Sequence, residues 1–179
     1  MAQFSQTWLQ LENKVRLGRG TLLAAVIITA INMVMALLDV DAYLFFSVSS
    51  AYYFTAFGKG LDNNFTGGSW PKTDVFSRTG VLMALVVLVG LLVVWFFSAD
   101  NKKLLRIAAV AMIVDTMVYM AVSLLTTGSM VPDLVEMVVH VYLIVTLFQA
   151  ASAWEEMERR RAQVVPEPVN APAEPWESE

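Results

Sequence analysis

Three ionisable side chains, Asp115, Glu136 and His140, fall inside long apolar stretches of the sequence. Glu136 and His140 are at positions i and i+4, so both lie on one face of a helix. A charged side chain at the bilayer centre costs about 2.5–3.5 kcal/mol on insertion scales, and such residues usually face the inside of a helix bundle. Carboxylates and imidazole can exchange protons or bind a divalent metal such as zinc. The three residues are therefore the candidate ion or proton site.

Asp115 and His140 are expected at the same depth in the membrane. A short turn at residues 126–130 joins their two apolar stretches, so the two helices must pack antiparallel. Asp115 lies about 13 residues before the centre of this turn and His140 about 12 residues after it. At equal rise per residue the two side chains reach the same level.

Four further polar residues are predicted to support this site, because they extend its helix faces or lie near its depth: Asn32, Tyr119, Asp133 and Arg78. Arg78 could pair with an acidic residue of the site or extend its side chain to the membrane surface. We favour extension to the surface. The inner halves of the four apolar stretches are almost uniformly apolar. The predicted file of polar groups therefore runs from the outer face only to the middle of the membrane.

The composition indicates a membrane protein. Of the 179 residues, 57% are hydrophobic and 16% are charged, and the mean hydropathy is +0.59, whereas a soluble domain has roughly 25% charged residues. Four apolar stretches are long enough to cross a bilayer, at residues 21–38, 79–98, 104–125 and 131–154. We therefore expect an all-α membrane protein with four transmembrane helices. Cysteine is absent, which excludes disulfides and thiolate chemistry, and no basic face indicates nucleic-acid binding.

The aromatic segment at residues 42–57 is too short and polar to be a clear fifth span. Cytoplasmic loops carry an excess of Lys and Arg. If this segment spans the membrane, six of the twelve Lys and Arg lie on each side; if it does not, nine lie on one side. The second split favours four spans with both termini in the cytoplasm. Residues 42–57 are then a re-entrant or interfacial segment on the outer face, and the interfacial form is slightly favoured.

The remaining segments flank a four-helix domain at residues 21–154. The pattern of residues 1–20 predicts an amphipathic N-terminal segment on the cytoplasmic surface. It equally fits a helical extension of the first span. Residues 155–179 are charged and then rich in Pro and Glu, which is typical of a disordered acidic tail.

Two functional interpretations remain open. In the first, Asp115, Glu136 and His140 handle a proton or a divalent cation, for transport or sensing. In the second, the protein is a non-catalytic membrane subunit or accessory protein, whose polar residues stabilise helix packing or bind a partner protein or a second copy. An enzymatic function is a weaker hypothesis than these two. It would need Ser47, Ser49 or Ser50 as a nucleophile beside Asp115 and His140, and no nucleophile motif supports it.

Three short motifs resemble a group of small uncharacterised bacterial multi-pass membrane proteins with no assigned activity. They are INMVMALLDVDAYLFFSVSSAYYF, the Asp115-Thr116 pair and E-x-x-x-H-V-Y-L-I, and the likeness covers residues 16–151. The resemblance implies a bacterial cytoplasmic (inner) membrane. It also implies an acidic residue and a histidine at the positions of Glu136 and His140, but no mechanism.

Overall fold

Every regular element that the structure describes is an α-helix. The computed structural model describes residues 2–38, 40, 42–44, 46–66, 75–127 and 134–164. Its helices are α1 (Ala2–Leu37), α2 (Ser49–Thr66), α3 (Val75–Phe97), α4 (Lys102–Thr127) and α5 (Leu134–Val164). Helices α1, α3, α4 and α5 are each long and apolar enough to cross a membrane. The predicted all-helical fold with four candidate spans is thus confirmed.

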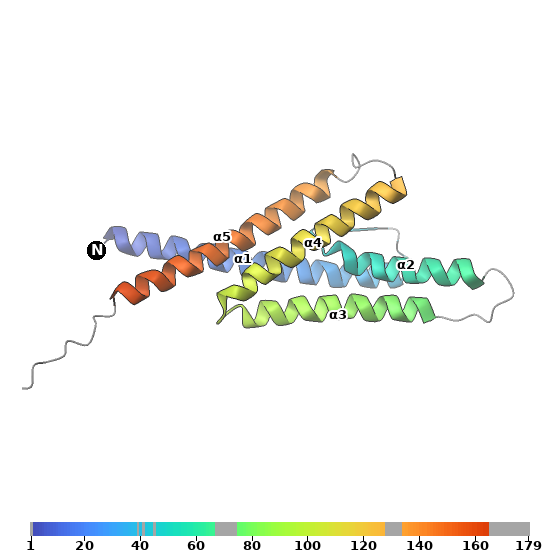
Figure 1. Cartoon of the computed structure of the whole chain (residues 1–179), viewed down its shortest axis with the longest axis horizontal. Helices are drawn as coiled ribbons and strands as arrows, with labels where there is room; N and C mark the ends of the chain where they lie inside the picture. Colours follow the sequence, from blue (N-terminus) through green and yellow to red (C-terminus); the bar gives the residue numbers. More distant parts are fainter. Residues whose placement is uncertain are drawn as a thin grey trace, which may run out of the picture.

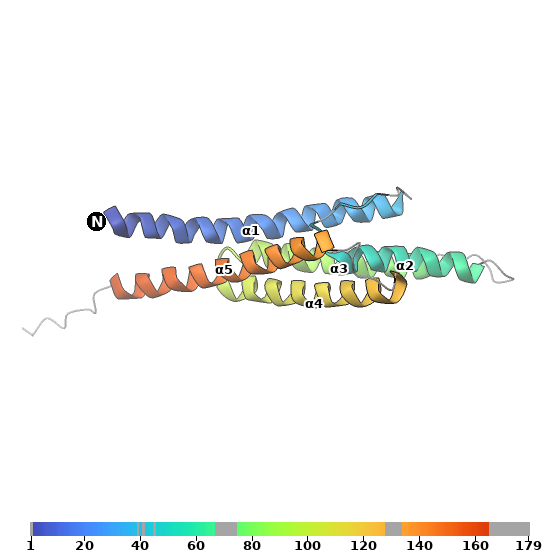
Figure 2. The ribbon, with the colours of Figure 1, turned by 90° about the horizontal axis from the view of Figure 1, so that it is seen from above.

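The two longest helices place both ends of the described chain at the same end of the molecule. Helices α1 and α5 pack side by side and extend past the turn between α3 and α4 (Figures 1 and 2). We call this the terminal end, and the opposite end, which α2 reaches, the α2 end. Helix α1 is continuous from Ala2, so the N-terminal segment continues the first span as one helix.

A block of small and branched apolar side chains fills the bundle between the terminal end and the site described below. It joins α1, α4 and α5 through residues that include Leu22, Ala25, Leu105, Ala108, Met112, Leu143, Leu147 and Ala150. Alanines and glycines let the helix backbones approach closely. A Cβ placed on Gly18 of α1 would clash with Ala150 of α5. In contrast, α3 keeps most of its apolar side chains exposed, which gives it a surface for lipid.

The aromatic segment folds back into the bundle, and it is called the re-entrant segment below. Residues 42–44 and 46–48 return from the end of α1 into the bundle without regular structure, and α2 begins beside Asp115, midway along α4. From there α2 runs outward along α3 to the α2 end (Figure 1). Phe46 has a φ of 74°, in the left-handed region that residues other than glycine seldom adopt. This residue lies where the segment changes direction.

Polar side chains fix α2 to the ends of its neighbours. Asp62 accepts backbone N–H groups from Phe76 (3.3 Å) and Ser77 (2.7 Å) at the start of α3, and Lys59 donates to the carbonyl groups of Ala36 (2.9 Å) and Leu37 (3.3 Å) at the end of α1. Each charge has the sign that the helix dipole favours. Close packing of α2 on α3 also needs Gly80, because a Cβ there would overlap the Phe54 carbonyl.

Candidate functional site

Asp115 caps the buried N-terminus of α2. Its Oδ2 accepts the backbone N–H of Ser49 at 2.9 Å, and its Oδ1 accepts that of Ser50 at 2.8 Å. Two of the N–H groups that an α-helix leaves without internal partners are therefore satisfied by one carboxylate from α4. Asp115 therefore lies at the positive end of the α2 dipole.

His140 lies between Asp115 and Glu136, and the hydrogen-bond partner of one ring nitrogen fixes the protonation of that nitrogen. Its Nδ1 is 2.9 Å from the backbone carbonyl of Glu136, one turn earlier in α5. A carbonyl oxygen only accepts, so Nδ1 must carry a hydrogen. The other nitrogen, Nε2, is 3.4 Å from Oδ2 of Asp115 and 3.4 Å from Oγ of Ser49. Two lone pairs would face each other at the Asp115 contact unless a proton lies on Nε2 or on the carboxyl group.

Glu136 accepts two hydroxyl groups. The phenol of Tyr43 donates to its Oε1 at 2.6 Å, and Oγ of Ser49 donates to the same oxygen at 2.9 Å. Burial, followed by the neighbouring Glu136 carboxylate, raises the pKa of the Tyr43 phenol well above its ordinary value. Tyr43 therefore remains a hydrogen-bond donor to Glu136.

A chain of hydrogen bonds extends from Tyr43 to α1. Tyr43 uses its single hydrogen on Glu136, so Ser47 donates to the Tyr43 oxygen at 2.7 Å and accepts from Nδ2 of Asn32 at 2.9 Å. Asn32 also exchanges hydrogen bonds with the backbone of Leu44, at 2.8 and 2.9 Å. This chain fixes the path of the re-entrant segment beside the candidate site.

The ionisable groups of the site are almost completely removed from solvent. The exposed fractions are 6% for Asp115, 4% for Glu136 and 1% for His140. Tyr119 stacks on the imidazole with ring centroids 5.8 Å apart, and Tyr53 of α2 stacks on Tyr119 at 6.2 Å. Two buried carboxylates and one imidazole thus share a cluster that is fully hydrogen-bonded when it holds one proton beyond that on Nδ1.

The structure brings together most of the predicted site. His140 contacts Asp115 directly and the Glu136 side chain through Ser49, Tyr119 covers the imidazole, and Asn32 joins through Ser47 and Tyr43. Arg78 is exposed in the first turn of α3. Asp133 lies outside the described residues. Thr29, which accepts the Val48 N–H at 2.7 Å, and Tyr43 were not anticipated. The Ser-rich aromatic segment was the only signal for Tyr43, and the sequence gives none for Thr29.

The arrangement suits proton exchange better than metal binding or hydrolysis. No group of three His, Asp or Glu residues in the described ranges is placed to hold a metal ion. Both oxygens of Asp115 are occupied by backbone N–H groups. In a Ser-His-Asp triad the carboxylate bonds Nδ1 and the serine faces Nε2. Here both Asp115 and Ser49 face Nε2, while Nδ1 bonds a backbone carbonyl.

Comparison with known proteins adds no assignment. No family model matches the chain, and neither a curated protein nor a solved structure is similar to it.

Proposed function

We propose that this membrane protein senses protons through the buried cluster of Asp115, Glu136 and His140. The observation that carries the proposal is the contact between Nε2 of His140 and Oδ2 of Asp115 at 3.4 Å, with Nδ1 already committed to a carbonyl. The contact is favourable only when one proton lies between the two groups. Histidine is the side chain whose charge ordinarily changes near physiological pH.

The state of this proton acts on α2. When His140 is protonated, Asp115 pairs with it and caps α2 as a carboxylate. When the proton is lost, two buried carboxylates are left with a neutral imidazole, and the cluster gains one negative charge in a low-dielectric interior. That change loosens the contacts of Ser49 and Ser50 with Asp115, on which the position of α2 depends. Helix α2 is therefore the element that converts protonation into movement.

The apolar block favours sensing over transport across the membrane. Toward the terminal end, His140 is followed on its own face by the buried side chains of Leu143 and Leu147, and Met112 and Ala108 occupy the facing positions of α4. A proton path would need a chain of polar groups or water through this layer. We take the proton to enter and leave on the α2 end. The Lys and Arg distribution predicts that this end faces outward, with both termini in the cytoplasm. The resemblance to small bacterial membrane proteins implies that the membrane is a bacterial cytoplasmic membrane.

The competing interpretation is that the same polar groups only stabilise helix packing in an accessory subunit. Hydrogen bonds between membrane helices average about 0.6 kcal/mol, and neutral side chains could make them. A packing role therefore predicts that neutral replacements keep the fold. It also predicts that the cluster gives the wild-type protein no pH response. The sensing role predicts a pH response that requires both Asp115 and His140.

Infrared spectroscopy of the protein in lipid vesicles distinguishes the two interpretations. We expect a pH-dependent change in the carboxyl and carboxylate bands that disappears in His140→Gln and in Asp115→Asn. Asp62→Asn is the matched control, because Asp62 is a second buried carboxyl group that caps a helix, at the other end of α2. The proposal fails if His140→Gln leaves the pH-dependent bands unchanged.

A further inference from the structure

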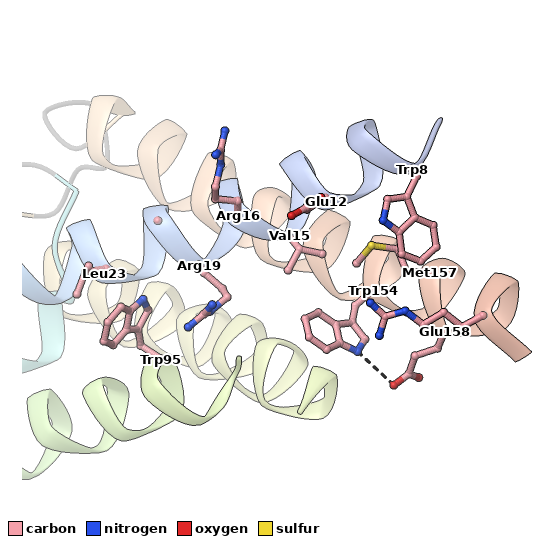
Figure 3. Close-up of a pocket in the computed structure, with 12 residues that line it drawn as sticks. Trp8, Glu12, Val15, Arg16, Arg19, Leu23, Trp95, Trp154, Met157 and Glu158 are labelled. Carbon is pink, nitrogen blue, oxygen red and sulfur yellow. Dashed lines mark hydrogen bonds between the residues drawn. The ribbon is translucent and has the colours of Figure 1, made fainter. Parts of the chain in front are cut away.

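A groove of about 520 Å³ lies at the terminal end, far along the bundle from the proton cluster. It is bounded by α1 and α5 and reaches the last turns of α3 (Figure 3). Its walls carry three tryptophans and three arginines: Trp8, Trp95, Trp154, Arg16, Arg19 and Arg161. Between them, Val15, Leu23 and Met157 contribute apolar surface. Aromatic rings, cations and apolar surface are thus combined in one concave site.

The arginines of the groove differ from the other arginines at this end of the molecule. Outside the groove, each guanidinium has a carboxylate partner: Arg106 pairs with Glu155 at 2.8 Å, and Arg159 and Arg160 pair with Glu156 at 3.6 and 2.8 Å. Within the described residues, no carboxylate pairs with any of the three groove arginines. Arg16 instead donates to the side chain of Asn13 at 3.2 Å.

Two of these guanidinium groups are held in place by aromatic rings. Arg19 lies over the Trp95 ring at 5.8 Å and donates from Nε to Oγ of Ser98 at 3.2 Å, which leaves its terminal N–H groups for a ligand. Arg161 lies over the Trp8 ring at 5.4 Å. A guanidinium fixed on a ring loses less freedom when it binds an anion. These contacts therefore prepare the groove for an anionic group.

The groove lies at the level where lipid headgroups meet the helices. Helix α3 is apolar up to Phe97, and the chain turns at residues 98–101 before α4 begins. Trp95 and Ser98 are therefore at the boundary between the apolar span and the polar turn. Tryptophan side chains gather at this boundary in membrane proteins, and basic pockets between helices on one face bind acidic headgroups.

We propose that the groove binds one anionic phospholipid, whose phosphodiester is held by Arg19 with Arg161, and whose acyl chains lie along the exposed apolar side of the bundle. Glu12 and Glu158 also line the groove, and Glu158 accepts the Trp154 indole N–H at 3.2 Å. Three guanidinium groups against two carboxylates leave one net positive charge. That balance matches the single charge of a phosphodiester better than a phosphate dianion.

Native mass spectrometry of the full chain, released from neutral detergent, tests this assignment. The protein is offered equal amounts of phosphatidylglycerol and phosphatidylcholine with identical acyl chains. We expect one phosphatidylglycerol to be retained in clear preference, and Arg19→Gln to weaken its binding about tenfold, the loss expected for a charge-assisted hydrogen bond. Arg159→Gln is the matched control, because it removes a positive charge that is paired outside the groove.

Three outcomes would overturn the proposal: equal retention of the two lipids, an equal effect of Arg159→Gln and Arg19→Gln, or displacement of the lipid by millimolar inorganic phosphate. The last result would identify a simple phosphate site. If Arg19→Gln does not fold, Arg161→Gln provides the same test, because Arg161 is exposed at the end of α5. The test is independent of the proton cluster.

Discussion

Replacing Asp115 by Asn should destabilise the folded protein by about 2–4 kcal/mol. Asparagine keeps one acceptor oxygen, so one of the two N–H groups at 2.9 and 2.8 Å remains bonded. The other faces an amide NH₂ group. Losing a hydrogen bond to a charged group costs about 1.5–3 kcal/mol. Removal of a buried anion from a helix N-terminus adds up to about 2 kcal/mol, and release of Asp115 from His140 offsets part of this sum.

The assay is reversible unfolding of the purified protein in mixed micelles, with hydrogen exchange of the first turn of α2 as a local measurement. We expect a lower unfolding free energy and faster exchange at Ser49 and Ser50. Asp100→Asn is the control, because Asp100 is an exposed carboxyl group in the turn after α3, and such changes usually stay within about 0.5 kcal/mol. A loss of less than about 0.5 kcal/mol for Asp115→Asn would refute the capping role.

Three further variants test other contacts, each by unfolding in the same micelles. Gly80→Ala should cost about 1–3 kcal/mol by forcing α2 from α3, whereas Gly90→Ala, which meets open space, should stabilise α3 by about 0.5–1 kcal/mol. Tyr43→Phe should cost about 1–2 kcal/mol by removing a donor from a buried carboxylate. Equal effects of the two glycine variants, or a neutral Tyr43→Phe, would contradict the described packing.

A pH dependence is expected from Asp62. Desolvation raises the pKa of Asp62, but hydrogen bonds from Ser77 and Phe76 outweigh it and hold the pKa below its ordinary value. Its contribution to stability is therefore complete at neutral pH and is lost as the pH falls through the lowered pKa. Asp62→Asn should remove this acid-side loss from the stability curve. If the stability of the variant falls as steeply at acid pH as that of the wild type, the loss of stability comes from other groups.

The sequence predicts those parts of the site that depend on local periodicity. Glu136 and His140 share a helix face because they are four residues apart, and the short connection between α4 and α5 brings Asp115 to the same depth. Both inferences need only the rise of a helix and an antiparallel pair. The four spans follow likewise from length and hydropathy.

The path of the re-entrant segment could not be derived in this way. The positions of Tyr43 and Ser49 depend on contacts that are distant in sequence, between residues 42–50 and Asn32, Thr29, Glu136 and Asp115. The aromatic residues of this segment fit a membrane interface equally well by composition. What places the segment inside the bundle is a carboxylate from another helix at the N-terminus of α2, and periodicity carries no signal for such a partner.

The most direct test of the proton cluster uses the fact that His140 is the only histidine. Nitrogen-15 NMR of histidine-labelled protein in lipid, recorded from about pH 4 to pH 9, covers the ordinary range of imidazole titration. We predict that Nδ1 stays protonated throughout, while Nε2 changes its protonation state with pH and Asp115→Asn alters that change. A histidine that does not titrate in this range, or whose neutral form carries its hydrogen on Nε2, would contradict the proposed function.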